Sequence, residues 1–149
     1  MKAPPGYQGK VCFRNWFDMF RPDLDEWRRR RANFPGAPKL LLDSRDEVLT
    51  FYEDFYNEHE TLLAPYFRNL YHVIKFVKTS DIQDKRRYTS LARAQLSKHE
   101  LFLLFYDCLS SQGKGFKPLV EEFGLLEHFD KKLLLNQSHA ELYASSAYQ

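Results

Sequence analysis

The feature that most constrains the fold is the long stretch Asp84–Ser110, which contains neither glycine nor proline. Its second half, Leu101–Leu109, is apolar on nearly every side of a helix, which is typical of a helix surrounded by other helices. At a rise of 1.5 Å per residue, one helix over the whole stretch would be about 40 Å long. We therefore expect a long central helix in this chain.

A polar stripe lies on the same predicted helix, just ahead of its apolar part. At 100° per residue, Arg93, Ser97 and Glu100 fall within a narrow angular band. Because a charged side chain on a buried helix needs a partner, the stripe either pairs with a neighbouring helix and fixes the packing, or lines a pocket or partner surface. Gln95, which lies between Arg93 and Ser97 in the sequence, belongs to the same candidate binding site.

The residues before this stretch predict two further helices. Ser44–Leu63 opens with the pattern Ser-Arg-Asp-Glu, a capping box in which the serine and glutamate side chains bond to free backbone N–H groups. Pro65–Lys78 follows, because proline suits the first turn of a helix, where its missing N–H group would have no partner. A second, weaker capping box at Ser80–Gln83 precedes the long helix. We expect the three helices to pack antiparallel.

The C-terminal part of the chain predicts shorter elements. Pro118 begins a short helix, and Gly124 ends it at a position where glycine tolerates the left-handed conformation. Leu125–Leu135 is expected to form another short helix, followed by a loose tail after Asn136. No pattern in the sequence indicates a β-strand. The predicted fold class is all-α: a compact helical bundle with a long central helix and short C-terminal helices.

The length of the chain fits a single folded core with two flanking segments. Residues 1–43 are expected to form an N-terminal helical extension, with short helices at Lys10–Phe20 and from Asp23, and a Pro/Gly-rich linker. Residues 44–135 form the helical core, and residues 136–149 form the C-terminal tail.

Composition and charge limit the classes of function. The aromatic content of 16% favours an aromatic core, since stacking platforms for nucleic-acid bases would need exposed rings beside a basic groove. The net charge of +2 is too small to argue for nucleic-acid binding by itself. Cys12 and Cys108 fit neither a zinc spacing nor a disulfide framework, which favours the reducing cytoplasm. No apolar run is long enough to span a membrane.

Metal and cofactor sites are not expected. His59, His128 and His139 have no second ligand at the spacing of a metal site. The sequence also has no glycine-rich phosphate loop and no nucleophile motif. We therefore predict no metal and no cofactor.

One dense basic cluster stands in the N-terminal segment, at Arg28, Arg29, Arg30 and Arg31. Such a run is typical of a solvated helix end. It could also contact nucleic-acid phosphates or anionic lipid.

A second candidate site combines residues from two predicted helices. Arg68 and His72 lie one helical turn apart. If their helix packs antiparallel to the next one, they approach Arg93 and Ser97 near the turn at Lys78–Lys85. The alternative is an exposed polar rim without a binding role.

Three motifs resemble the signature of a known family. They are Pro65–Tyr71 followed by Val73–Phe76, Arg93–Ser97 followed by Glu100–Tyr106, and Gly115–Glu121 followed by Leu125–Glu127. In this order they are similar to the phage abortive infection (AbiC-like) family, over roughly residues 45 to 130. The resemblance implies a bacterial anti-phage defence protein, a class that senses infection and stops the host cell. Many members carry membrane-spanning helices ahead of this region, so the periphery of the inner membrane is the alternative location to the cytoplasm.

Two mechanisms are compatible with this resemblance and with the candidate residues. The first is a helical sensing or protein-interaction module whose polar stripe and aromatic surface engage a phage or host protein, or a second copy of the chain. The second is an RNA-cleaving toxin domain similar to the HEPN class, whose motif is an arginine, four to six residues, and a histidine. Arg93 and His99 have that spacing, although Ala94 stands where the motif usually has a polar residue. In that site His99 would act as general acid or base, and Arg93 would stabilise the transition-state charge.

Overall fold

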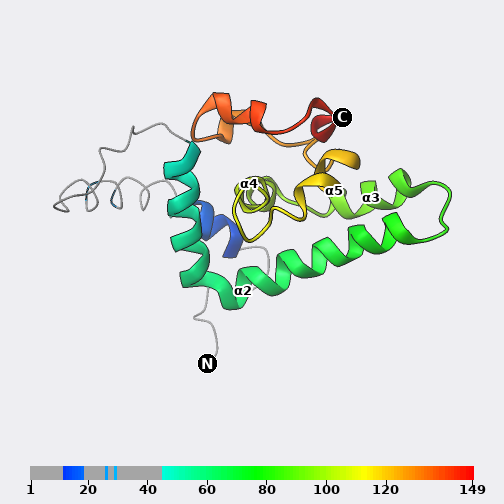
Figure 1. The fold of residues 1–149 in the computed structure, drawn as a ribbon, viewed down its shortest axis with the longest axis horizontal. Helices are drawn as coiled ribbons and strands as arrows, with labels where there is room; N and C mark the ends of the chain where they lie inside the picture. The colour runs from blue at the N-terminus through cyan, green and yellow to red at the C-terminus, as the bar shows by residue number, and fades with distance from the viewer. Residues whose placement is uncertain (1–11, 19–25, 27–28, 30–44) are drawn as a thin grey trace.

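The structure, a computed structural model, describes residues 12–18, 26, 29 and 45–149. Within these ranges the chain forms helices and no strand, which confirms the all-α prediction (Figure 1). A short helical segment at residues 12–18 comes first. The elements that follow are the α-helices α2 (Arg45–Thr79), α3 (Lys85–Ala94), α4 (Lys98–Asp107) and α5 (Lys117–Glu122) and the 3-10 helices η1 (Lys131–Leu133), η2 (Gln137–Leu142) and η3 (Ser145–Tyr148). Most of the expected N-terminal extension and linker lies outside the described residues.

Helix α2 is one continuous helix that bends, with Pro65 inside it. In Figure 1 its first half runs along one side of the molecule, and its second half continues in a different direction. A proline inside a helix removes one backbone hydrogen bond, and its ring pushes against the preceding turn, which kinks the helix. The prediction of separate antiparallel helices at Ser44–Leu63 and Pro65–Lys78 is therefore wrong. Ser44 and its capping box lie outside the described residues.

The second half of α2 and helix α3 form an antiparallel pair, here called the α2–α3 hairpin (Figure 1). The Lys85 ammonium donates a hydrogen bond to the Lys78 carbonyl at 2.6 Å and so closes the turn between the helices. Helix α3 is capped by the side chain of Asp84, which accepts a hydrogen bond from the Arg87 N–H at 3.2 Å. The expected cap at Ser80–Gln83 is therefore wrong, because the helix begins later.

Helix α4 is the central helix of the fold and is seen end-on in the middle of Figure 1. Every side chain from Glu100 to Asp107 is buried, which confirms the prediction of a helix surrounded by others. The single helix expected over Asp84–Ser110 is wrong, however, because the chain leaves the helical path between Ala94 and Lys98. The apolar helix thus starts afresh at its own cap, and the residues ahead of it belong to α3.

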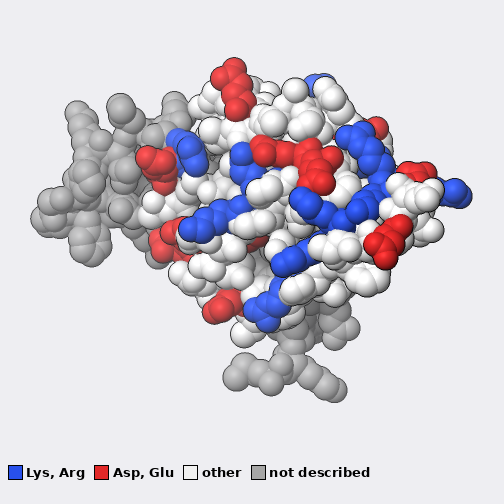
Figure 2. All heavy atoms as spheres, turned by 45° about the vertical axis from the view of Figure 1, so that its right-hand side comes forward, with Lys and Arg blue, Asp and Glu red and all other residues white. Residues whose placement is uncertain are grey.

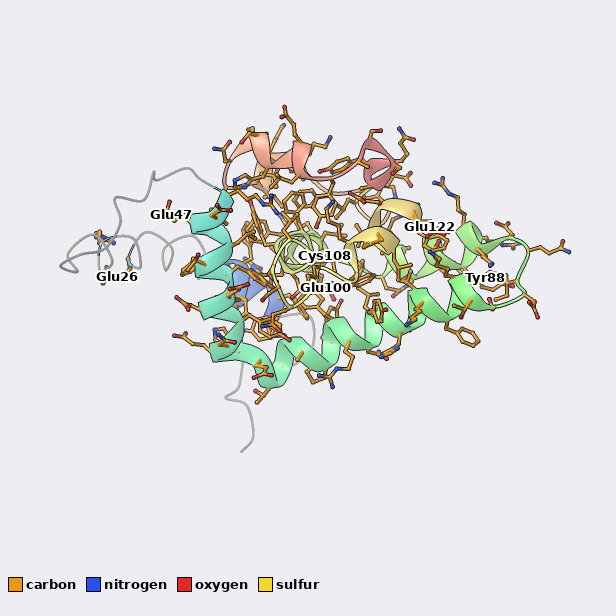
Figure 3. The ribbon with its side chains drawn as sticks, viewed as in Figure 1. Glu26, Glu47, Tyr88, Glu100, Cys108 and Glu122 are labelled. Carbon is orange, nitrogen blue, oxygen red and sulfur yellow. The ribbon has the colours of Figure 1, made fainter. Side chains whose placement is uncertain are left out.

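The core around α4 is rich in aromatic side chains, as the composition predicts. The Phe105 ring stacks on Phe129 with ring centroids 5.3 Å apart and lies 4.8 Å from the Tyr143 ring. Trp16, from the short N-terminal helical segment, is fully buried in the same cluster. Figure 3 shows how densely these side chains fill the space between α2, α4 and the C-terminal segments. Each buried ring removes a large apolar area from water, so these aromatic side chains stabilise the core.

The C-terminal residues complete this core. Helix α5 carries Pro118 in its first turn, and Gly124 follows it with φ of +60°, both as predicted. The helix expected at Leu125–Leu135 is wrong: this segment consists of turns and the short η1. The tail after Asn136 is not loose either, since the buried Tyr143 hydroxyl donates to the Phe105 carbonyl at 2.6 Å. None of the helices in the described part of the chain is long and apolar enough to cross a membrane.

Candidate functional site

Ser97 and Glu100, the C-terminal two residues of the predicted polar stripe, form the N-terminal cap of α4. The Glu100 N–H donates to Ser97 Oγ at 3.3 Å, and the Ser97 N–H donates to Glu100 Oε2 at 2.7 Å. These two bonds make a capping box, which satisfies backbone N–H groups that the first turn leaves without a helical partner. The helix break that separates α3 from α4 therefore depends on these two side chains.

Glu100 also connects α4 to α2. It is only 2% exposed, and its Oε1 accepts a hydrogen bond of 2.6 Å from the Tyr66 hydroxyl, one residue after the proline of α2. Burial and this hydrogen bond raise the pKa of Tyr66, so the hydroxyl keeps its proton and can donate it. Figure 3 shows Glu100 in the interior of the molecule. Glu100 thus joins the bend of α2 to the start of the central helix.

Arg93, the upper part of the stripe, points to a different part of the molecule. Its Nη1 donates to the carbonyl of Gly124 at 3.0 Å and forms an ion pair with Glu127. The Arg93 side chain is 13% exposed, whereas the Glu127 side chain is 38% exposed, so the pair lies at the surface with its arginine mostly covered. Because the chain breaks after α3, Arg93 does not continue the helical face of Ser97 and Glu100. It holds α3 to the turn that follows α5.

His99 has other neighbours again. Its ring lies 4.9 Å from the ring of Phe17, in the short N-terminal helical segment. Burial, with Lys98 beside it, lowers the pKa of His99, so the imidazole is neutral at pH 7. The five-residue separation from Arg93 therefore spans the break between two helices, and each side chain packs against a different part of the fold.

The second half of α2 carries Arg68 and His72, both exposed. The His72 ring contacts Tyr71 edge-on at 5.3 Å, while Arg68 lines a pocket described below. Arg93 donates to the Gly124 carbonyl, and no contact joins it to Arg68 or His72. The composite site of these three residues with Ser97 therefore stays a prediction. Gln95 is the exposed C-cap of α3, and its N–H donates to the Ala92 carbonyl at 3.1 Å.

The basic run is mostly outside the described residues. Arg29 is described; it is exposed and lies 3.4 Å from Glu26, an ion pair one helical turn apart. No role for Arg28, Arg30 or Arg31 is tested by the structure. Among the described residues, no three His, Cys, Asp or Glu side chains gather where a metal ion could be held.

Two hollows mark the surface near these residues. The first, the α3 hollow, lies between α3 and the turn after α5 and is lined by Asp84, Arg86, Arg87, Ser90, Arg93, Phe123 and Glu127. The second, the Asp107 pocket, lies between α2 and the loop after α4 and is lined by Tyr56, Ala64, Phe67, Arg68, Tyr71, Asp107, Gln112, Gly113, Gly115 and Phe116. Arg93 and Arg68 thus belong to separate hollows.

A comparison with protein families identifies the family of this chain. One family model, described as "Putative phage abortive infection protein", matches residues 58–133, just over half of the chain. The chain belongs to this family. The match runs from the first half of α2 to η1, so the part of the chain shared with other abortive infection family members contains the α2–α3 hairpin and the whole of α4 and α5. No curated protein and no solved structure matches the chain.

Within the region that matches the abortive infection family, the sequence hypotheses missed Asp107. It is 3% exposed, and its Oδ1 accepts a hydrogen bond of 3.0 Å from the Tyr52 hydroxyl. Burial raises the pKa of Asp107 to about 7. The signal was present, because Asp107 is the one acidic residue in the apolar run Leu101–Leu109. A lone carboxyl in such a run should have been treated as a candidate site.

Proposed function

We propose that this chain is an anti-phage defence protein of the abortive-infection type, and that its helical domain is a sensing module that binds another protein through the α2–α3 hairpin. Membership of the abortive infection family supports the first part of the proposal. The observation that carries the second part is the exposure of large apolar side chains on both helices of the hairpin. The argument for the partner comes from the charge of the same segment.

The hairpin presents four large apolar side chains to solvent. Phe76 is 68% exposed and Leu91 is 61% exposed, and the others are Val73 and Tyr88. We call these four residues the hairpin surface; Figure 3 places Tyr88 near the tip of the hairpin. Val73 and Phe76 lie one turn apart on α2, and Tyr88 and Leu91 lie one turn apart on α3, so each helix exposes an apolar pair whose burial by a partner would be favourable.

The hairpin is also the most basic part of the described fold. Residues 66–95 contain seven Lys or Arg and two Asp, a net charge of +5, whereas the whole chain carries +2. Lys85, Arg86 and Arg87 open α3, where the positive end of the helix dipole disfavours cations. Figure 2 shows Lys and Arg side chains spread over the side of the molecule that carries the hairpin, with acidic side chains among them. This pattern supports a partner with an acidic face.

The charge favours a different protein over a second copy of the chain. In a symmetric dimer the same surface faces itself, so two positively charged hairpins would meet. Like charges across an interface oppose association. We therefore commit to a phage or host protein with an acidic, partly apolar surface as the partner.

The candidate stripe residues fit this module as supports of the hairpin. Arg93 ties α3 to the turn after α5, and Ser97 and Glu100 fix where α3 ends and α4 begins. The ribonuclease alternative needs Arg93 and His99 to face one cleft with the arginine free to bind a phosphate. Arg93 is bound to Glu127 and Gly124, and His99 packs on Phe17, which supports the non-catalytic module.

The test is a plaque assay on cells that express the wild-type chain or the double variant Phe76→Ser/Leu91→Ser. Both side chains are exposed, so we expect unchanged expression and melting temperature but loss of protection against a panel of phages. Leu62→Ser is the matched control, because Leu62 is also exposed but precedes the bend of α2. Protection by the double variant at the wild-type level would contradict the hairpin as the contact surface, and absence of wild-type protection from every phage would contradict the defence role.

Two further measurements separate the alternatives in the same cells. Total RNA from infected cells should stay intact with the wild type, and His99→Ala should still protect. RNA cleavage that disappears with His99→Ala would replace the module by the ribonuclease mechanism. The purified wild type should be a monomer by light scattering; a dimer that Phe76→Ser/Leu91→Ser dissociates would identify a second copy as the partner.

A further inference from the structure

The Asp107 pocket is a second candidate site, separate from the hairpin surface. Its volume is about 270 Å³, near the lower end of the range for small-molecule sites. Residues of α2 form one wall, and the loop between α4 and α5 forms the other. Neither the defence role nor the contact surface proposed above depends on what this pocket does.

The floor of the pocket is the buried Asp107 carboxyl group, and one of its two oxygens accepts no hydrogen bond from the described residues. Tyr52 donates to Asp107 Oδ1, but no described residue donates to Oδ2. Oδ2 lies against Gly113, another lining residue, so closely that a Cβ atom at position 113 would overlap it. Because Asp107 lines the pocket, Oδ2 is an acceptor that a donor group of a ligand can use.

The rim of the pocket carries a cation, Arg68, that forms no ion pair with the described residues. Arg68 is exposed, and no acidic side chain of the described residues forms an ion pair with it. Its neighbour along the pocket wall, Tyr71, makes a ring contact with Phe116 at 5.6 Å, so the wall beside Arg68 is held in place by packing. A guanidinium in this position can bind a phosphate or carboxylate through two parallel hydrogen bonds.

Half of the other residues that line the pocket are aromatic. Tyr56, Phe67, Tyr71 and Phe116 line the pocket. Aromatic side chains give wide, flat, weakly polar surfaces that favour a flat ligand body, either stacked or edge-on. The pocket therefore offers an anion site at the rim, an aromatic middle and a hydrogen-bond acceptor at the floor.

We propose that the Asp107 pocket binds a small molecule with a planar body, an anionic group that pairs with Arg68 and an N–H group that donates to Asp107. Two kinds of metabolite have this chemistry: nucleoside monophosphates, with a phosphate and a base N–H group, and tryptophan, with a carboxylate at one end and an indole N–H group at the other. The polar ends are the same in both, so the experiment has to tell the sources apart.

The test uses the purified full chain and two ligand panels, followed by saturation-transfer NMR and calorimetry. One panel holds AMP, GMP, CMP and UMP, and the other holds Trp, with Phe and Tyr, which have no ring N–H group, as its controls; inorganic phosphate alone and adenine alone serve as fragments. We expect one panel to bind with a Kd of about 1 mM or tighter, and each fragment to bind more weakly than the intact ligand. No binding by either panel would overturn the proposal.

Arg68→Ala is the main variant, because an exposed residue can be replaced without loss of the fold. It should weaken binding roughly tenfold or more, as expected for the loss of a charge-assisted pair. Arg86→Ala is the matched control: an exposed arginine of the α3 hollow whose loss should leave the affinity unchanged. If Arg86→Ala weakens binding and Arg68→Ala does not, the ligand binds in the α3 hollow and the proposal is wrong.

Asp107→Asn tests the floor of the pocket. The amide keeps an acceptor for the Tyr52 hydroxyl but can replace Oδ2 by an NH₂ group, which cannot accept the ligand N–H. Binding should therefore fall while the melting temperature shows that the variant is folded. Unchanged affinity of a folded Asp107→Asn protein would contradict the assignment of the ligand donor to this carboxyl group.

Discussion

Replacing Asp107 by asparagine should raise the free energy of unfolding above that of the wild type, and the gain should grow as the pH rises. The carboxyl group is 3% exposed, and burial raises its pKa from an ordinary value of 3.8 to about 7. Its single protein hydrogen bond, from Tyr52, only partly offsets the loss of water around the charge. The folded state therefore binds the proton more tightly than the unfolded state does.

The sign and size of the effect follow from this difference. Because the pKa is raised on folding, the wild type has the full stability of the protonated group below pH 3.8 and loses it as the pH rises to about 7. A shift of about three pKa units corresponds to about 4 kcal/mol. Asparagine stays neutral throughout and does not have this loss. The variant should match the wild type within about 1 kcal/mol near pH 4 and exceed it by up to about 4 kcal/mol near pH 8.

Urea denaturation measures this difference. Unfolding is followed by far-ultraviolet circular dichroism at several pH values between 4 and 8, and the free energy of unfolding of the wild type is subtracted from that of the variant. Burial lowers the pKa of His99, but this residue is present in both proteins and its contribution cancels in the subtraction. Asp81→Asn, at an exposed site in the turn between α2 and α3, is the matched control and should give a difference that does not change with pH. A flat difference for Asp107→Asn as well would refute the reasoning, because it would mean that the buried carboxyl costs nothing to ionise.

Three other substitutions test the contacts around α4 and α5. Ser97→Ala removes the side-chain acceptor of the capping box and should lower the free energy of unfolding by about 1 kcal/mol, measured by urea denaturation; an unchanged value would mean that the break between α3 and α4 does not need the cap. Tyr66→Phe deletes the donor to Glu100 and should lower it by about 1.5 to 3 kcal/mol, while Tm should fall accordingly; no fall would show that the bond contributes nothing. Gly124→Ala places a Cβ atom in a left-handed turn and against the Gln149 carbonyl, so Tm should fall and the last residues should exchange their amide hydrogens faster; wild-type protection of these amides would contradict the contact.

The sequence predicts the burial of the central helix and the elements around α5 well, because these depend on local signals. A run of apolar residues on every side has only one stable place, the core, and Pro118 and Gly124 mark a start and an end by their backbone chemistry. The break before α4 was also encoded, as the pattern Ser97-Lys-His-Glu100. The absence of glycine and proline favours a continuous helix, but the capping box of Ser97 and Glu100 stabilises a new helix start instead.

Other features could not be predicted from local signals. Pro65 is compatible with both the first turn of a new helix and a kink inside an old one, and only the packing of α2 against α4 decides between them. The C-terminal segment has a single large aliphatic residue, Leu142, and no helical period, yet Tyr143 and Ala147 are buried. The Asp107 pocket combines residues of α2 with residues of the loop after α4. These segments are far apart in the sequence, so their spacing along the chain does not predict that they meet.

The role of the C-terminal residues in closing the core has a consequence for the making of the protein. Ala147 is fully buried and its carbonyl accepts the Leu126 N–H at 2.9 Å, while Tyr143 covers Phe105. A ribosome that adds about 5–20 residues per second needs about 2–8 s to go from the end of α4 to Ala147. Until those residues are added, the apolar sides of α4 that they contact have no C-terminal cover. The core around α4 is therefore complete only once Tyr143 and Ala147 are in place.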